Sequence, residues 1–320
     1  MAERIADVAV IIPMLNEAET LPFLLRDLAA QTVRPRELLF SDAGSSDGSA
    51  RIVSAWWEAA AWEGGSCQVL SSPGALPGGG RNRGLAQCTA RRIAFIDAGL
   101  GLSPEWLEEM LEALDGSDGL DAIYAQCRFQ GTGVLGAALC GLSYGQGAER
   151  PALVGSLFKQ EAVRRSGLFA EHLRAGEDLR WTKGFDAAGG KRGRAPRALI
   201  HYMFFPPSFA AAIRKWRVYE KYAVLAGVGG RSRLLSCLLL AMGVAGVVIP
   251  AAWFLGVLYL LGRGVADPLR RSDRRLWLSS PAAVALALLL APALDVAKLW
   301  GGIQGCVARF SGAASRVGES

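Results

Sequence analysis

Short apolar runs that end in polar residues alternate with helix-like segments along residues 8–202. The first run, at residues 8–12, is short and rich in β-branched side chains and stops at Pro13, which predicts a buried strand. Leucines at helical spacing in residues 20–32 then predict an amphipathic helix. Residues 37–41 predict the next strand. Strand, helix and strand thus follow one another at the start of the chain.

The same alternation continues along the chain. Strands are expected at residues 67–71, 93–96, 121–130, 153–159 and 197–202, and helices at residues 49–62, 81–90, 103–114, 160–166 and 177–188. Residues 73–80 are rich in Gly and Pro and predict a loop, whereas residues 131–155 show no clear pattern. Repeated strand–helix units predict an α/β fold, with a mainly parallel sheet covered by helices on both faces.

Polar side chains stand where the first two strands end. Asn16 and Glu17 follow the first strand, and Asp42 follows the second. In an open parallel sheet, ligands bind beyond the carboxyl ends of the strands. These residues therefore predict a polar ligand with hydroxyl groups and ring nitrogens, such as a nucleotide.

Five short motifs follow one another between the first strand and residue 178. They are PMLNE at residues 13–17, SDAGSSDGS at 41–49, GGGRNRG at 78–84, FIDAG at 95–99 and GED at 176–178. Together they resemble the motifs of family 2 glycosyltransferases, the inverting group with the GT-A fold. The resemblance covers about the first 200 residues. It implies that residues 1–207 form a GT-A domain that uses a nucleotide-diphosphate sugar.

The resemblance also implies how the donor is held. Pro13, Asn16 and Glu17 would line the nucleoside pocket, and Asp42 would bind the base. A carboxylate suits uracil because the N3–H group of uracil is a hydrogen-bond donor, so UDP is the expected nucleotide. Asp47, in the same motif as Asp42, is better explained as a cap of the following helix.

Arg81 and Asn82 stand where the glycine-rich stretch meets the next expected helix. A helix start offers free N–H groups and positive potential to a phosphate, and an arginine adds charge. Members of the resembled family often place an Arg-Asn pair here against the nucleotide. Arg83 is expected to be exposed, and the glycines at residues 78–80 match neither the Walker nor the Rossmann pattern.

The family usually carries an Asp-x-Asp motif after the fourth strand, which contacts the ribose and a divalent cation, Mg²⁺ or Mn²⁺. Asp97 supplies the first carboxylate here, but Gly99 replaces the second. Because Mg²⁺ keeps several waters and uses substrate phosphates as ligands, Asp97 alone can suffice. His201, after the last strand, is a further candidate for a metal ligand or a diphosphate contact. The alternative for His201 is a structural histidine.

Glu177 and Asp178 match the Glu-Asp motif that opens a helix on the acceptor side in this family. The resemblance implies that Asp178 is the catalytic base, which accepts the proton of the acceptor hydroxyl. Glu177 would position the acceptor or assist. Two acids at a helix N-terminus also favour the helix dipole, so the pair has a structural explanation as well.

Hydrophobic residues make up 51% of the 320 residues, and the excess lies in the C-terminal part of the chain. Residues 234–262 and 276–294 carry no charged side chain. About 20 apolar residues suffice to span a bilayer. Two hydrophobic, C-terminal transmembrane helices are therefore expected in a membrane region at residues 234–303, followed by a tail at residues 304–320.

Residues 208–233 precede this region and mix aromatic with basic side chains. They predict an amphipathic helix that lies on an anionic leaflet or, alternatively, packs on the domain as a surface helix. Basic residues flank both ends of the membrane region, which places the catalytic domain on the cytoplasmic side of the cytoplasmic membrane. Five arginines at residues 263–275 oppose this arrangement, so a re-entrant hairpin is the alternative. Asp295 and Lys298 are expected to pair on one helix face.

The remaining composition narrows the class of protein. The net charge of +6 is explained by the flanks of the membrane segments and by an anionic donor, without nucleic acid. Six cysteines are scattered and form no CxxC motif, which argues against a zinc site and against a dense disulfide framework. The N-terminus lacks a charged start followed by a long apolar core, so no signal peptide is expected.

The sequence therefore predicts an inverting, membrane-anchored glycosyltransferase. It would move a sugar from a UDP-sugar to a membrane-associated acceptor, such as a lipid-linked saccharide in cell-surface glycan synthesis. Processive polysaccharide synthases of the resembled family carry a Gln-x-x-Arg-Trp motif before their membrane helices. This chain has no such motif there, so the resemblance implies transfer of one sugar rather than polymerisation. Three alternatives remain: a non-catalytic donor-binding or assembly subunit, a nucleotidyltransferase, and a membrane scaffold or transporter component.

Overall fold

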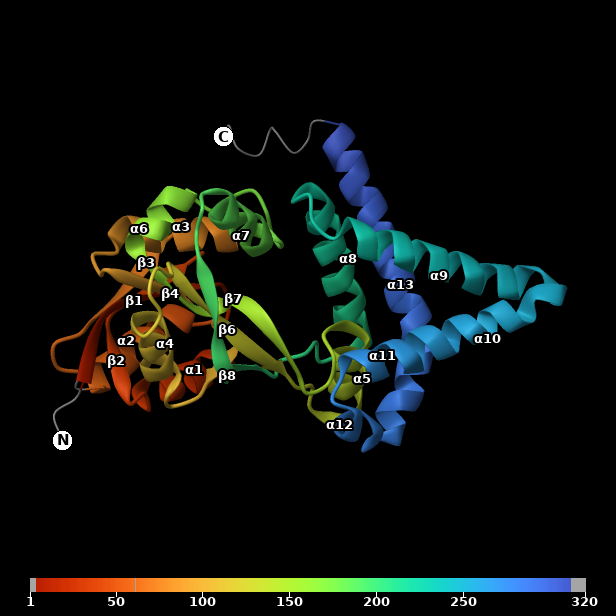
Figure 1. Ribbon diagram of the computed structural model, residues 1–320, viewed down its shortest axis with the longest axis horizontal. Helices are drawn as coiled ribbons and strands as arrows, with labels where there is room; N and C mark the ends of the chain where they lie inside the picture. The colour runs from red at the N-terminus through yellow and green to blue at the C-terminus, as the bar shows by residue number, and fades with distance from the viewer. Residues whose placement is uncertain (1–3, 61, 312–320) are drawn as a thin grey trace. The chain divides into compact units, whose positions relative to one another are not determined.

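The protein divides into two compact units (Figure 1). A computed structural model describes residues 4–60 and 62–311. The sheet unit contains the chain up to Arg128 together with Glu149–Leu173 and Glu177–Tyr202. The helical unit contains Phe129–Ala148, Arg174–Gly176 and the chain from Met203 onward.

The sheet has eight strands in the order β3-β2-β1-β4-β7-β6-β8-β5. Their bounds are β1 Arg4–Met14, β2 Val33–Asp42, β3 Ser66–Ser71, β4 Arg92–Phe95, β5 Leu100–Leu102, β6 Ala122–Phe129, β7 Ala148–Lys159 and β8 Arg192–Tyr202. Every strand expected from the sequence is present. The unexpected strand is β5, whose three residues are too few to show a period.

The parallel arrangement expected from the sequence is present on one side of the sheet, which is mixed as a whole. β1 pairs in parallel with β2 and β4, and β2 with β3. β7 runs antiparallel to β4, and β5 antiparallel to β8. Strand–helix alternation in the sequence predicts parallel neighbours only where consecutive strands are adjacent, and the strand order no longer follows the chain beyond β4.

Six helices accompany the strands of the described sheet unit. They are α1 Leu21–Ala29, α2 Ser49–Ala59, α3 Pro77–Gln87, α4 Trp106–Asp115, α6 Gln160–Ser166 and α7 Glu177–Ala187. α3 begins four residues before the expected start, so the glycines at residues 78–80 lie in a helix and not in a loop. Pro77 occupies the first turn, where its missing N–H costs nothing.

The glycines of α3 allow this helix to lie directly on β1. A Cβ atom at Gly84 would lie 2.4 Å from Cγ2 of Ile11, and one at Gly80 would lie 2.9 Å from Cβ of Pro13. Any larger residue would push α3 away from the strand. The close contact fixes Arg81, which lies between these two glycines, at the carboxyl end of β1.

The helical unit contains α5 and the chain after residue 203. Its elements are α5 Gly133–Ser143, α8 Phe209–Leu225, α9 Gly230–Val248, the 3₁₀ turn η1 Pro250–Ala252, α10 Trp253–Leu261, the π-helix η2 Gly262–Ala266, α11 Asp267–Arg271, α12 Arg274–Leu278 and α13 Pro281–Phe310. The core of this unit gathers around the fully buried Trp277.

The apolar stretch at residues 234–262 forms a hairpin and not one long helix, which corrects the expected first span. α9 ends at Val248, the chain turns through Pro250, and α10 runs back along α9 (Figure 1). The two helices touch where a Cβ atom at Gly246 would lie 2.2 Å from the backbone nitrogen of Gly256. Proline has no N–H to continue the helical ladder, which explains the break.

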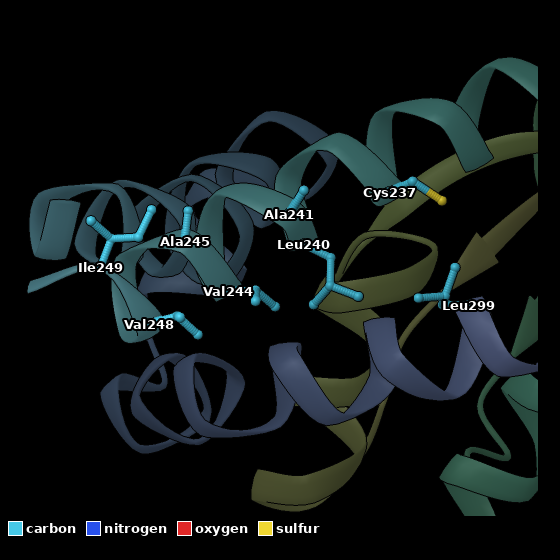
Figure 2. Close-up of a pocket in the computed structure, with 8 residues that line it drawn as sticks. All are labelled: Cys237, Leu240, Ala241, Val244, Ala245, Val248, Ile249 and Leu299. Carbon is cyan, nitrogen blue, oxygen red and sulfur yellow. The ribbon is translucent and has the colours of Figure 1, made fainter.

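Within the described residues, α13 is the one helix long and apolar enough to cross a membrane. The expected second apolar helix therefore begins later and runs further than residues 276–294. α9 and Leu299 of α13 border an apolar groove of about 470 Å³ (Figure 2). Apart from Leu299, it is lined by Cys237, Leu240, Ala241, Val244, Ala245, Val248 and Ile249.

Candidate active site

The loops that follow β1 and β2 are tied to each other. Asn16 adopts a left-handed conformation with φ of 55°. Its backbone N–H donates to Oγ of Ser45, and its Oδ1 accepts from the N–H of Ser46, both at 2.9 Å. Oδ1 of Asp42 accepts from the N–H of Ser45 at 2.9 Å and from its Oγ at 2.6 Å. The structure thus brings Asn16 and Asp42, both expected at the donor site, to one edge of the sheet.

Asp47 has the structural role expected for it, although Gly48 is the residue at the N-cap of α2. Its carboxylate accepts from the backbone N–H of Ser49 at 3.0 Å and of Ala18 at 2.9 Å. The Ser49 hydroxyl and the Ala18 N–H lower the pKa of Asp47. Glu17 joins the same loops, because its N–H donates to Oγ of Ser49.

Arg81 is the centre of a charged cluster beside these loops. Its Nη1 donates to Oε1 of Glu177 at 2.6 Å, and its Nη2 donates to Oδ1 of Asp97 at 2.7 Å. The Arg81 side chain is only 2% exposed. Its Nε–H is buried and has no partner among the described residues. The sequence placed Arg81 at a helix start facing phosphate, whereas the structure places it in the second turn of α3 between two carboxylates.

Burial sets the protonation of the acids in this cluster. Burial raises the pKa of Glu177 and of Asp178, although the neighbouring Arg81 acts in the opposite direction on both. Burial disfavours the guanidinium charge, but Asp97, Glu177 and Asp178 outweigh it and raise the pKa of Arg81. The cluster therefore holds one permanent cation against three carboxyl groups, two of which bind a proton more readily than usual.

An aromatic stack lies under the guanidinium and was not expected from the sequence. The Phe169 ring lies 5.5 Å from the Arg81 guanidinium carbon and stacks on Trp181 with 4.8 Å between ring centroids. Trp181 donates to the backbone oxygen of Gly167 at 2.8 Å. Trp181 follows Glu177 by four residues on α7, and this spacing was the available signal that both face the same side.

Asn82 is used inside the fold. Its Nδ2 donates to the backbone oxygen of Phe169 at 3.0 Å and to Oε1 of Glu171 at 2.8 Å. Its Oδ1 accepts from the N–H of Phe169 at 2.9 Å. Asn82 is buried, so its amide fixes the Phe169 loop and has little capacity left for the expected nucleotide contact.

No hydrogen bond or ion pair joins His201 to Asp97 among the described residues. His201 lies on β8, paired with Gly101 of β5, and its Nε2 is 3.3 Å from Oγ of Ser103. Burial and the nearby Arg128 lower the pKa of His201. These contacts support the structural alternative for His201.

The described residues contain no group of three or more His, Cys, Asp or Glu side chains that could hold a metal ion. Asp97 is half exposed and shares one oxygen with Arg81. Gly99 adds no ligand. These residues fit a cation held by Asp97, waters and the phosphates of a donor, and do not fit one held by protein ligands alone.

Residues 9–139 match the family described as Glycosyl transferase family 2. The chain contains a family 2 glycosyltransferase domain. The resemblance found in the sequence motifs is thereby confirmed for the part that carries the loops after β1 and β2, Arg81 and Asp97. Glu177, Asp178 and His201 lie beyond the matched residues.

Two curated relatives cover parts of the chain. Glycosyltransferase AglE of Haloferax volcanii is 27% identical over 202 residues, which are 59% of this chain and 64% of AglE. Undecaprenyl-phosphate 4-deoxy-4-formamido-L-arabinose transferase of Klebsiella pneumoniae is 37% identical over 120 residues, 36% of this chain and 35% of that protein. The chain thus aligns with less than two thirds of the length of either relative.

The fold is shared with a solved structure. Mannosyltransferase PcManGT from Pyrobaculum calidifontis, in complex with GDP-Man and Mn²⁺, superposes with a TM-score of 0.55 at 15% identity. The match covers 95% of this chain and 88% of PcManGT. The α/β fold expected from the sequence is confirmed by this likeness.

Proposed function

We propose that this protein is an inverting glycosyltransferase that moves a sugar from a nucleotide-diphosphate donor to a membrane-associated acceptor. One observation carries the proposal. Arg81 joins Asp97, just after a strand in the family domain, to the buried Glu177, which directly precedes Asp178 at the start of α7. Inverting transfer requires two parts, a site that holds the donor and a base that takes the proton of the acceptor.

The donor would occupy the edge formed by the loops after β1 and β2. Asn16, Glu17 and Pro13 would surround the nucleoside, and Asp42 would accept the N3–H of uracil. In support, both hydrogen bonds to the Asp42 carboxylate from the described residues reach Oδ1, which leaves Oδ2 for a base. Arg81 and Asp97 stand beside this edge, where the diphosphate and an Mg²⁺ or Mn²⁺ ion would lie. Such an ion would neutralise the charge of the leaving diphosphate.

Asp178 would act as the base. As the acceptor hydroxyl attacks the anomeric carbon, its proton passes to Asp178 and the bond from that carbon to the diphosphate oxygen breaks, releasing the nucleotide diphosphate. A base works best when its pKa lies near the working pH, so the burial that raises the pKa of Asp178 suits this role. Glu177, which is held by Arg81, would help to position the acceptor.

The acceptor would be lipid-linked, with the domain on the cytoplasmic face of the membrane. α13 meets the length and composition of a spanning helix. Large apolar side chains of the helical unit are exposed, including Trp253 at 65% and Phe310 at 90%, which favours an apolar surrounding. The curated relative named for undecaprenyl phosphate supports a polyprenyl-linked acceptor.

The test is nucleotide release from UDP-, GDP- and dTDP-sugars in membranes and in detergent. Each donor is assayed with Mg²⁺, Mn²⁺ or EDTA, and with undecaprenyl phosphate or a lipid-linked saccharide extract as acceptor. Release from one donor that depends on acceptor and is lost in Asp178→Asn is the expected result. Nucleotide binding without turnover under every condition would favour the alternative of a non-catalytic subunit. In that case, the replacement of the second Asp-x-Asp carboxylate by Gly99 would have removed the activity. No binding of any nucleotide would refute the proposal.

A further inference from the structure

One guanidinium connects a solvent-accessible carboxylate with a buried one. The Asp97 side chain is 51% exposed, whereas the Glu177 side chain is only 6% exposed. Arg81 hydrogen-bonds to both. α3 and α7, which carry Arg81 and Glu177, lie side by side (Figure 1). A ligand that arrives from solvent meets Asp97 first, and Arg81 links that position directly to the start of α7.

The surroundings of Arg81 fix it in this place. Gly84 holds α3 against β1, and Asn82 fixes the backbone of Phe169, whose ring lies under the guanidinium. Arginine suits the position because its planar fork directs two N–H groups at two separate carboxylates, which a lysine ammonium cannot do with the same geometry. These contacts hold Arg81 on the α3 side of the cluster.

We propose that Arg81 is a positioning residue, which fixes the Asp178 carboxylate by holding Glu177 at the start of α7 and links its placement to Asp97. The inference rests on the proposed function of Asp178. It differs from the direct donor contact expected from the sequence, because Nη1 and Nη2 of Arg81 each already bind a carboxylate of the chain.

The charges that face Asp178 come from three places. Arg81 on α3 favours its ionised form and Asp97 after β4 opposes it, while Asp178 in turn raises the pKa of Glu177 on α7. Removing Arg81 therefore removes the one cation of this group and raises the pKa of Asp178 further. Lysine at the same position keeps the charge and loses the fork, so the two substitutions separate charge from geometry.

The experiment compares Arg81→Gln and Arg81→Lys with Arg83→Gln, whose parent residue is exposed two positions further along α3. Affinity for UDP, GDP and dTDP is measured by calorimetry, and kcat is measured against pH with the donor that the panel identifies. Nucleotide affinity is expected to stay within about threefold in both Arg81 variants. Their kcat is expected to fall about 10–100-fold, as for a misplaced catalytic group. In Arg81→Gln alone the rising limb of the pH profile moves to higher pH, and Arg83→Gln behaves as wild type.

Two results would overturn the inference while leaving the proposed function intact. One is a loss of nucleotide affinity that matches the loss of kcat with an unmoved pH profile, which would make Arg81 a donor contact. The other is wild-type turnover. If Arg81→Gln does not fold, Glu177→Gln replaces it, with the same expected loss of kcat at retained affinity, and wild-type kcat in that variant would overturn the inference. A wild-type protein that binds no nucleotide would overturn both proposals.

Discussion

Each unit of the molecule buries one arginine between two carboxylates, and the two arginines differ in what they leave open. In the helical unit, Nε of Arg263 lies 3.0 Å from Oδ2 of Asp295, and Nη1 lies 3.0 Å from Oδ2 of Asp267. Its Nη2 donates to the backbone oxygen of Leu142 at 3.1 Å. Every nitrogen of Arg263 thus has a partner, and the Asp295 side chain is 0% exposed.

Arg81 in the sheet unit has the same two-acid arrangement, but its Nε lacks a partner among the described residues and its partner Asp97 is half exposed. The charge balance differs too. Arg263, Arg271 and Lys298 surround two aspartates in the helical unit, whereas Arg81 faces three carboxyl groups. A satisfied cluster of this kind holds helices together, while an unsatisfied one with excess carboxyl groups has capacity left for a ligand and a proton.

The largest expected effect of a single substitution is on catalysis. Asp178→Asn is expected to lower kcat by about 10²–10⁴-fold, because the base is removed, and to leave nucleotide affinity unchanged. The measurement is nucleotide release together with calorimetric binding. Asp186→Asn is the matched control, since Asp186 lies on the same helix and pairs with Arg192 at the surface. Full turnover by Asp178→Asn would remove the base from the mechanism.

In the helical unit the same chemical change is expected to affect stability. Asp295→Asn leaves the buried Arg263 without one of its two carboxylate partners, which costs about 3–5 kcal/mol. Thermal unfolding in detergent, followed by tryptophan fluorescence, measures the loss. The double variant Arg263→Met with Asp295→Leu is expected to recover part of it, because the guanidinium no longer stays buried without Asp295. Arg270→Gln is the control, since it breaks an exposed pair with Asp267 worth at most about 1 kcal/mol. An unchanged melting temperature for Asp295→Asn would show that Arg263 does not depend on the pair.

The two clusters also differ in how far the sequence predicts them. The Asp295–Lys298 pair follows from helical spacing, and the structure contains it at 3.8 Å. The GT-A resemblance likewise leads to Arg81, Asp97 and Glu177. Their mutual contact could not be predicted, because it joins residues 16 and 96 positions apart through the placement of α3 on β1. Only the packing of glycines against Ile11 and Pro13 reveals that placement.

The sequence predicted features that depend on a single helix or strand. It did not predict features that depend on how neighbouring elements pack. Strands and helices of the sheet unit lie close to the predicted residues. The direction of β7 depends on which strand it meets, and nothing in residues 148–159 encodes that. The apolar run at residues 234–262 has the composition of one span, but the glycine contact between α9 and α10 stabilises a hairpin. Gly78 and Gly80 predict a loop by composition and serve instead as contact points of a helix.

Glycine contacts offer a smaller test that applies to both units. Gly84→Ala would place Cβ 2.4 Å from the buried Ile11, and Gly301→Ala would place it 2.1 Å from the backbone oxygen of Arg217. Each is expected to lower the free energy of unfolding by about 1–3 kcal/mol. Gly79→Ala is the matched control in α3, because its nearest atom would lie 3.5 Å away, and it is expected to stabilise by about 0.5–1 kcal/mol. Equal effects at residues 79 and 84 would contradict the placement of α3 on β1.

The smallest expected effect is a change in melting temperature, whose sign differs between the Arg81 cluster and the Arg263 cluster. Burial raises the pKa of Asp178, so its proton binds more tightly in the folded than in the unfolded state. The folded state is then favoured below the ordinary carboxyl pKa and loses this advantage as the pH rises through the raised value. An asparagine side chain cannot ionise, so Asp178→Asn is expected to raise the melting temperature by a few degrees at about pH 8 and by nothing near about pH 4.

Asp295→Asn, in contrast, should lower the melting temperature, because the buried Arg263 then loses a carboxylate partner. A pH series of melting temperatures for both variants, with Asp186→Asn as the exposed control, measures the two signs in one experiment. Loss of stability in both asparagine variants would mean that Asp178 is a structural partner like Asp295. The Arg81 cluster would then stabilise the fold in the same way as the Arg263 cluster. Opposite signs are expected, because a cluster with too few cations gains stability when one carboxylate is neutralised, and a balanced cluster loses it.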